Sequence, residues 1–183
     1  VASREGHEQV LRVLAEAGAD INKADAGGET PLHRASREGH EQVVRALAGL
    51  GADVNQADED GWSPVYRASN EGRAQMVRVL AALGADLNQA SSVGNSPLHI
   101  ASQNGHVQVV HALAELGADV NQTNDNNGVT PLFGASYEGH EQVVRALADL
   151  GADVNQSNIH GHSPVYIASQ QGHEQVVRAL GGE

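Results

Sequence analysis

Histidine is the residue with the widest chemical range in this chain, which contains ten of them. Histidine is a common metal ligand and a general base near neutral pH. Several return at a nearly constant interval, with Arg73 in the place of one member: His7, His40, His106, His140 and His173. Zinc needs ligands that converge at about 2 Å, whereas equivalent residues of packed helices lie about 8–10 Å apart. We therefore expect hydrogen bonding between helices and turns, and no metal site.

Other arrangements that could support catalysis are also explained by simpler roles. His160 and His162 form a local His-x-His pair, but neither a carboxylate nor a third ligand accompanies them. Acidic residues return at one place in each repeated block, where shaping a turn accounts for them: Asp20, Asp53, Asp86, Asp119 and Asp153. The sequence shows no catalytic triad order and no phosphate-binding glycine loop. It predicts a protein that is not an enzyme and needs no cofactor.

The charge balance limits the classes of partner. Lys and Arg number 11 against 23 Asp and Glu, a formal net charge of -12. Nucleic acids and anionic membranes call for the opposite sign, so we expect a protein or peptide partner, with a basic surface favoured. Cysteine is absent, which excludes disulfides. Because the sequence has no apolar run of about 20 residues and no signal-peptide pattern, we expect a cytoplasmic or otherwise intracellular protein.

The recurring histidines and aspartates belong to a repeated block of sequence. A hydroxyl residue followed by proline recurs at spacings of 33, 33, 34 and 33: Thr30–Pro31, Ser63–Pro64, Ser96–Pro97, Thr130–Pro131 and Ser163–Pro164. Thr30 is a good N-cap, and Pro31 has the backbone angle that the first turn of a helix requires. The pattern predicts a short helix ending at Gly39. A second helix begins near His40 and is ended by Gly51, with four apolar side chains at helical spacing: Val43, Val44, Leu47 and Leu50.

The block resembles the ankyrin repeat, whose period is 33 residues and whose signature is Thr-Pro-Leu-His-x-Ala. Residues 30–35 match the signature, and residues 96–101 differ only by serine for threonine. The resemblance implies an all-α solenoid of about 5.5 repeats, each a helix-turn-helix with a β-hairpin finger. We expect one domain over residues 1–183, divided into partial repeats and four complete ones: 1–27, 28–60, 61–93, 94–127, 128–160 and 161–183.

The chain begins and ends inside a repeat, and neither end resembles the polar cap that solenoids usually carry. We interpret it as a piece of a longer array and expect a monomer. The alternative is a structural or self-assembling scaffold whose uncapped ends stack. Growth of oligomers with concentration would distinguish the two.

Positions that differ between the units are free to specialise, and they fall on the finger tip, the end of the first helix and the finger residue before the tip. Ala24, Ala57, Ala90, Asn124 and Ser157 form this last group. The ankyrin resemblance implies that such positions line a concave binding surface. Trp62 and Tyr137 are the favoured anchors, although Trp62 could instead pack along its own finger. The predicted partner-binding residues are Glu29, Arg37, Glu59, Asp60, Trp62, Asn70, Glu71, Val93, Asn95, Gln103, Asn126, Asn127, Val129, Tyr137, Ile159, His160, His162 and Gln170.

Three irregularities stand out from the repeat. The fourth finger has one extra residue within 122–128, so its tip should bulge, either as a contact loop or as a tolerated insertion. Gly134 leaves a gap where other units carry a larger side chain. Arg34 and Arg67 either form a basic spot or pair with nearby carboxylates, and the sequence leaves both interpretations open.

A second resemblance concerns the enzymatic hydroxylation of asparagine side chains. Leu47 and, after five residues, Asp53-Val54-Asn55 resemble the pattern that asparaginyl hydroxylases recognise in ankyrin proteins. The candidate sites are Asn55, Asn121 and Asn155.

Overall fold

The computed structural model describes residue 13 and residues 17–181. Within them it contains ten helices and no strand, in agreement with the expected all-α solenoid. Five helices begin at the recurring proline: α2 (Pro31–Glu38), α4 (Pro64–Asn70), α6 (Pro97–Gln103), α8 (Pro131–Glu138) and α10 (Pro164–Gln171). Each is followed by a second helix: α3 (Glu41–Gly49), α5 (Ala74–Ala82), α7 (Val107–Glu115), α9 (Glu141–Asp149) and α11 (Glu174–Gly181).

The first helix of each unit forms for the local reasons expected from the sequence. Thr30 has an extended backbone, with φ -80° and ψ 166°, and its side chain accepts a hydrogen bond from the N–H of His33. Pro31 follows at the first helical position, where no N–H is needed. Gly39 ends the helix with φ 85°, a left-handed conformation that suits glycine. The chain can therefore turn sharply into the second helix.

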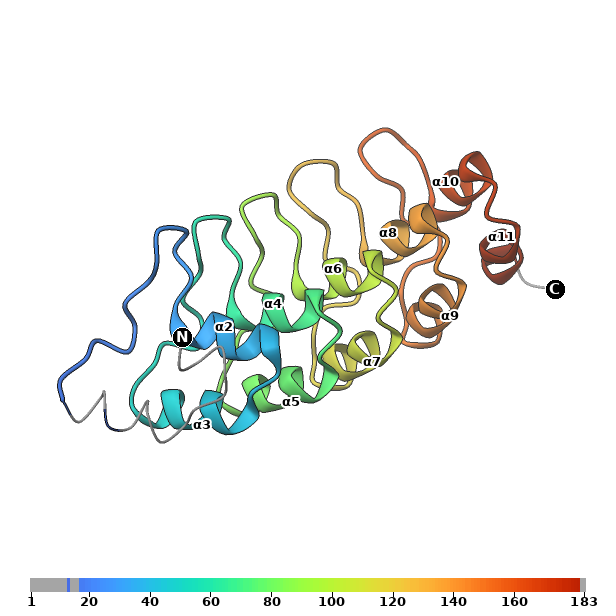
Figure 1. Ribbon diagram of the computed structural model, residues 1–183. Coiled ribbons are helices and arrows are strands. Elements are labelled where there is room, and N and C mark those ends of the chain that lie inside the picture. Colours follow the sequence, from blue (N-terminus) through green and yellow to red (C-terminus); the bar gives the residue numbers. More distant parts are fainter. Residues whose placement is uncertain (1–12, 14–16, 182–183) are drawn as a thin grey trace.

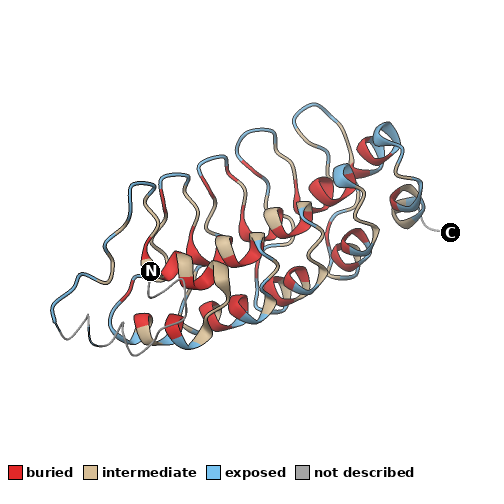
Figure 2. Ribbon diagram, in the orientation of Figure 1, coloured by how far each residue is buried: buried red, intermediate tan, exposed pale blue. Residues whose placement is uncertain are grey.

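The helices stack in two rows, and the units follow one another in sequence order (Figure 1). In one row α2, α4, α6, α8 and α10 pack each on the next, and α3, α5, α7, α9 and α11 form the other row. Leucine and valine side chains from both rows make a continuous core, among them Leu32, Leu47, Leu98 and Leu113, each at most 1% exposed. Figure 2 shows the buried residues along the helix rows and the exposed residues at the finger tips.

The second helix is terminated by its glycine as predicted, although the last apolar residue of its pattern lies outside the core. Helix α3 stops at Gly49, with Leu50 as its C-cap and Gly51 in a left-handed conformation beyond it. Leu50 is 41% exposed, so the last of the four apolar residues at helical spacing does not join the buried core. The apolar spacing continued past the last helical turn, and the chain leaves the core before Leu50 can enter it. Every helix in the described part of the chain is too short or too polar to span a bilayer.

The fingers double back without forming strands in the described residues. Each is closed at its tip by hydrogen bonds: in the second finger, Asp58 N donates to Trp62 O (3.1 Å) and Gly61 N donates to Asp58 O (3.0 Å). Adjacent tips are also joined, since Glu59 N donates to Gly27 O (3.3 Å) and so links the first finger to the second. The hairpin shape of the finger therefore depends on turn contacts and on its neighbours.

Asparagine side chains at the base of the fingers connect successive units. Asn55 Nδ2 donates to Gly84 O (3.2 Å), and its Oδ1 accepts from Asp86 N (2.8 Å). Asp53 Oδ1 accepts from Asn55 N (2.9 Å), which confirms the turn-shaping role expected for the recurring aspartates. Asn121 makes the same two contacts, with Gly151 O and Asp153 N, so these asparagines satisfy backbone groups of the next repeat.

The recurring histidines also connect the units. His106 Nε2 donates to Asn70 O (2.9 Å), and His140 Nε2 donates to Gln103 O (2.8 Å). Arg73 makes the corresponding contact through Nε to Arg37 O (3.3 Å). The partner in each case is the carbonyl at or near the end of the preceding unit's first helix. His7, the first member of the series, lies outside the described residues.

Candidate partner-binding site

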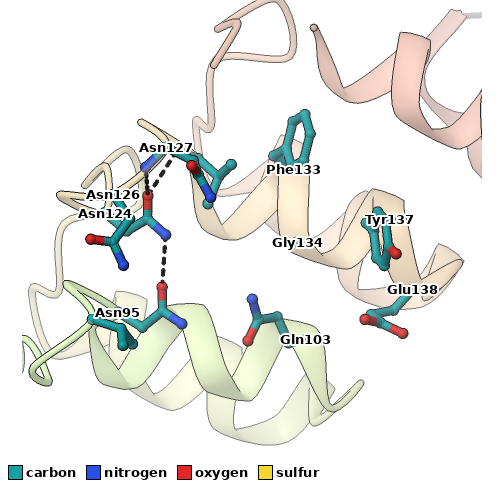
Figure 3. Close-up of a pocket in the computed structure, with 11 residues that line it drawn as sticks. Asn95, Gln103, Asn124, Asn126, Asn127, Phe133, Gly134, Tyr137 and Glu138 are labelled. Atoms are coloured by element: carbon teal, nitrogen blue, oxygen red, sulfur yellow. Dashed lines mark hydrogen bonds between the residues drawn. The ribbon is translucent and has the colours of Figure 1, made fainter. Parts of the chain in front are cut away.

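A cavity of about 350 Å³ lies between the finger and first helix of the third and fourth complete units (Figure 3). Helix α6 and its preceding finger supply one wall, and the fourth finger with α8 supplies the other. The lining residues are Val93, Asn95, Gln103, Asn124, Asn126, Asn127, Val129, Phe133, Gly134, Tyr137 and Glu138. The lining is rich in carboxamides and contains one carboxylate and no cation.

Gly134 opens part of this space. Other units carry Arg34, Arg67, Ile100 or Ile167 at the same position of the first helix. Gly134 itself is buried in α8, and a Cβ placed on it would lie 3.0 Å from Cγ of Gln103 in the neighbouring helix. The gap that the sequence indicated at Gly134 therefore faces Gln103.

The bulged finger forms another side of the pocket. Asn124 Oδ1 accepts from Asn127 N (3.1 Å) and from Val129 N (3.2 Å). Its Nδ2 donates to Asn95 Oδ1 in the preceding finger (3.0 Å). Gly128 N closes the tip on Asn124 O (3.2 Å). The expected bulge is confirmed, because this turn spans one residue more than its counterparts.

The extra residue lies after Asn124, which corrects one assignment made from the sequence. Asn124 makes the tip contacts that Asp58 makes in the second finger, where Oδ1 accepts from Asp60 N (3.0 Å) and Trp62 N (2.9 Å). Thr123 is therefore the counterpart of Ala24, and the placement of Asn124 in that series was wrong. The sequence pattern showed an insertion but could not show which side of Asn124 received it.

The structure brings seven of the predicted partner-binding residues to this pocket: Val93, Asn95, Gln103, Asn126, Asn127, Val129 and Tyr137. Tyr137 is 46% exposed, and Gln103 is half-buried. Phe133 and Glu138 also line the pocket. Glu138 belongs to the variable end of the first helix, whereas Phe133 was not predicted to contact a partner. The position of Phe133 directly before Gly134 in the sequence was the observation that could have identified it.

At the other end of the solenoid, the predicted residues Glu29 and Arg37 belong to an ion-pair network. Glu29 lies 3.0 Å from Arg37 Nη1, 3.3 Å from Arg34 Nη2 and 3.2 Å from Arg67 Nη2. Arg67 Nη2 also lies 2.6 Å from Asp58 Oδ2, and Arg34 pairs with Asp25. The ion-pair interpretation of Arg34 and Arg67 is therefore confirmed, and these arginines do not form an unpaired basic spot.

Trp62 packs within its own unit. Its ring stacks on Tyr66 with the centroids 5.1 Å apart, and the guanidinium carbon of Arg67 lies 4.2 Å from the centroid of the Trp62 ring. The side chain is partly buried. This arrangement agrees with the alternative in which Trp62 packs along its own finger.

The remaining predicted residues lie apart from the pocket. Glu59 and Asp60 are exposed at the second finger tip, and Asn70 donates to Glu71 near the end of α4 (3.0 Å). Ile159 and His160 end the unit 128–160, and His162 and Gln170 belong to the last unit, where the His162 ring stacks on Tyr166 with centroids 4.3 Å apart. Among the residues described, no three His, Asp or Glu side chains gather where they could hold a metal ion.

A buried histidine contacts the backbone of one residue that lines the pocket. His99 is 1% exposed, and its Nε2 donates to the carbonyl of Val129 (3.0 Å). Burial lowers the pKa of His99, while the hydrogen bond to Val129 opposes that shift. The neutral ring thus joins α6 to a residue that lines the pocket.

Comparison with known protein families matches nearly the whole chain. A family model described as ankyrin repeats (3 copies) matches residues 50–124 and 120–182. A second, described as ankyrin repeats (many copies), matches residues 1–47. No curated protein matches the chain significantly. The structure and the family models agree with the resemblance seen in the repeated motif, and the chain therefore belongs to the ankyrin-repeat family.

Proposed function

We propose that this chain is a non-catalytic interaction module that binds a protein or peptide along its fingers and first helices, over the complete units within residues 28–160. Ankyrin repeats are generally protein-protein interaction modules. The pocket lined by Val93, Asn95, Gln103 and Tyr137 is the centre of the proposed contact. A partner segment lies across it, with one side chain entering the space beside Gly134.

One observation carries this proposal: seven positions that differ between the repeats line one cavity. The residues common to all units stack the helices, whereas these residues face a hollow that internal packing leaves open. Tyr137 adds an aromatic ring beside the hollow, and aromatic residues are enriched among those that dominate binding energy. Since the walls belong to packed helices and joined fingers, binding requires little reordering.

The charge of the molecule supports a partner with a basic surface around the contact. The formal net charge of -12 attracts positive charge at long range and speeds encounter. This attraction acts over the molecular surface and does not define the group that enters the pocket. We therefore expect association to slow as salt concentration rises.

A displayed peptide library selected on the wild-type chain tests the proposal. Selected peptides are then titrated against Gly134→Ile, which fills the pocket with the side chain that Ile100 and Ile167 provide elsewhere, and against Tyr137→Ala. We expect each variant to weaken binding about tenfold or more, the loss of about 1.4 kcal/mol. Gln142→Ala, on the exposed side of α9, is the matched control and should bind as the wild type does.

Equal affinity of the selected peptides for Gly134→Ile, Tyr137→Ala and the wild type would refute the pocket as the contact. If Trp62→Ala alone weakens binding, the contact lies over the second finger instead.

A further inference from the structure

The second complete unit shows what fills the equivalent space when the side chain is large. Arg67 stands at the position of Gly134, and its guanidinium contacts the Trp62 ring and Asp58 of the finger. Asp58 Oδ2 lies 2.6 Å from Arg67 Nη2, and Glu29 Oε1 of the preceding unit lies 3.2 Å from it. The Asp58 side chain is 1% exposed and that of Glu29 is 11% exposed. A cation in this space is therefore held by two carboxylates.

The pocket beside Gly134 contains neutral residues at the positions of Arg67, Asp58 and Glu29. Its residue at the position of Arg67 is Gly134, Asn124 replaces Asp58, and Asn95 replaces Glu29. Each of these three charged groups is thus exchanged for a neutral one. Placing an ion in a partly desolvated site costs free energy unless an opposite charge accompanies it. An arginine guest would lack the two carboxylates, and a carboxylate guest would find no cation among the lining residues.

The carboxamides that remain offer both donors and acceptors. Asn95 Oδ1 accepts from Asn124 Nδ2, which leaves the Nδ2 group of Asn95 as a donor. The side-chain amides of Gln103, Asn126 and Asn127 have no hydrogen-bond partner among the residues that the structure describes. Figure 3 shows the Gln103 amide directed toward the helix that carries Gly134. In the same view, Glu138 and Asn124 lie on opposite sides of the pocket. The polar lining is therefore neutral around Asn95 and Asn124.

From these observations we propose that the pocket binds the side-chain carboxamide of a glutamine or asparagine on the partner protein. This inference rests on the proposed function and names the group that it recognises. A carboxamide carries an acceptor oxygen and two N–H donors, so it pairs with another carboxamide in both directions. Val93, Val129 and Phe133 provide apolar wall for the methylene groups of such a side chain.

Nuclear magnetic resonance titration with blocked amino acids tests the inference. The probes are the N-acetyl, N′-methylamide derivatives of glutamine, glutamate, arginine and leucine. We expect the glutamine derivative to give saturable shifts of the side-chain NH₂ signals of Asn95, Gln103, Asn126 and Asn127. The other three derivatives should bind about tenfold more weakly, because each leaves a donor or acceptor unpaired or brings an uncompensated charge.

Two variants sharpen the test. Gly134→Ile should abolish the shifts, with Ile100→Ala as the control at the equivalent position of the preceding unit. Asn95→Glu combined with Asn124→Asp restores the two carboxylates that hold Arg67 and retains the acceptor that closes the finger tip. This double variant should prefer the arginine derivative over the glutamine derivative, a reversal that does not depend on Gly134→Ile being folded.

The inference is wrong if the wild type binds the arginine, glutamate or leucine derivative as well as glutamine, if no probe gives saturable shifts, or if the double variant keeps the wild-type preference. If this test fails while the selected peptides still bind Gly134→Ile more weakly than the wild type, the proposed function stands and the pocket recognises another chemical group. If the peptides are also insensitive to that variant, the proposed function fails as well.

Discussion

His33 and His99 each connect two repeats through a single imidazole ring. The N–H of Thr30 donates to Nδ1 of His33 (3.1 Å), and Nε2 donates to Trp62 O in the next unit (2.9 Å). His99 repeats this arrangement with Ser96 (3.1 Å) and Val129 (3.0 Å). Because Nδ1 accepts from a backbone N–H, the proton is on Nε2 and the ring is neutral. A second proton would remove the acceptor on which the helix cap depends.

Stability should therefore fall in mild acid. Burial is the main cause that lowers the pKa of His33 and His99 below the ordinary histidine value of 6.5. A lowered pKa means that the unfolded chain binds protons first, so the stabilisation is complete above about pH 6.5 and is lost as pH falls toward the folded pKa. Urea unfolding at neutral pH and at about pH 5.5 measures this loss.

The control for this measurement is the double variant His33→Tyr and His99→Tyr, since Tyr66 and Tyr166 occupy the same position in other units. Its stability should change less between the two pH values. An identical change in wild type and variant would show that other groups cause the acid sensitivity.

Asp58 combines two roles that substitutions can separate. Asp58→Asn keeps the acceptor for the finger tip, as Asn124 and Asn158 do naturally, but removes the charge beside Arg67. We expect a loss of about 2 kcal/mol in the free energy of unfolding, because the arginine loses its closest partner. Adding Arg67→Ile, the residue found at position 100, should recover most of that loss in a double-mutant cycle. Additive effects of the two changes would contradict this account.

The finger is stabilised by its neighbours as much as by its own turns. Asn55 and Asn121 use their side chains to bind backbone groups of the following unit, Asn55 through Gly84 O and Asp86 N. Asn121 likewise contacts Gly151 O (3.3 Å) and Asp153 N (2.8 Å). An enzyme that needs access to either side chain must first separate two units.

These bridges lead to a prediction about the proposed hydroxylation sites. If an asparaginyl hydroxylase modifies Asn55 and Asn121, each should gain an oxygen atom more slowly in the folded chain than in a synthetic peptide of the same segment, because in the folded chain a bridge between units must be broken first. Peptide mass spectrometry after timed incubation with the enzyme and its cosubstrates measures the rates. Equal rates in the folded chain and in the peptides would contradict this account, and absence of modification at Asn55, Asn121 and Asn155 would exclude the sites.

The whole molecule is a row in which each unit contacts its neighbours. First helices pack on first helices and second helices on second helices along the row, so stability spreads through local interfaces. The ion-pair network around Glu29 and the amide pocket around Gly134 are separate features of this row. One surface can therefore change its chemistry from unit to unit while the core remains the same.

At this scale the expected state is a monomer, and stacking of copies is the alternative. Three large apolar side chains in the last two units are exposed and would be covered by stacking: Ile159 (68%), Tyr166 (48%) and Val165 (36%). Light scattering over a wide concentration range should give the mass of one chain throughout. A mass that rises with concentration, and returns to that of one chain in Ile159→Ser, would favour the self-assembling scaffold.

The amino-acid sequence determined the repeat and the position of its helices. Thr30, Pro31 and Gly39 act on the backbone within a few residues, so their effects could be inferred from spacing. The variable positions around Tyr137 could be identified for the same reason, because comparison of aligned units needs no coordinates. The apolar spacing did not reveal that Leu50 lies beyond the last turn of α3.

The tertiary structure decided which residues of neighbouring units meet. Asn95 and Asn124 are 29 positions apart, and Glu29 and Arg67 are 38 apart. Their contacts depend on how one unit is rotated and shifted against the next, which is set by the packing of the two helix rows. The sequence could therefore indicate a gap at Gly134, but only the packed units made it part of a neutral pocket.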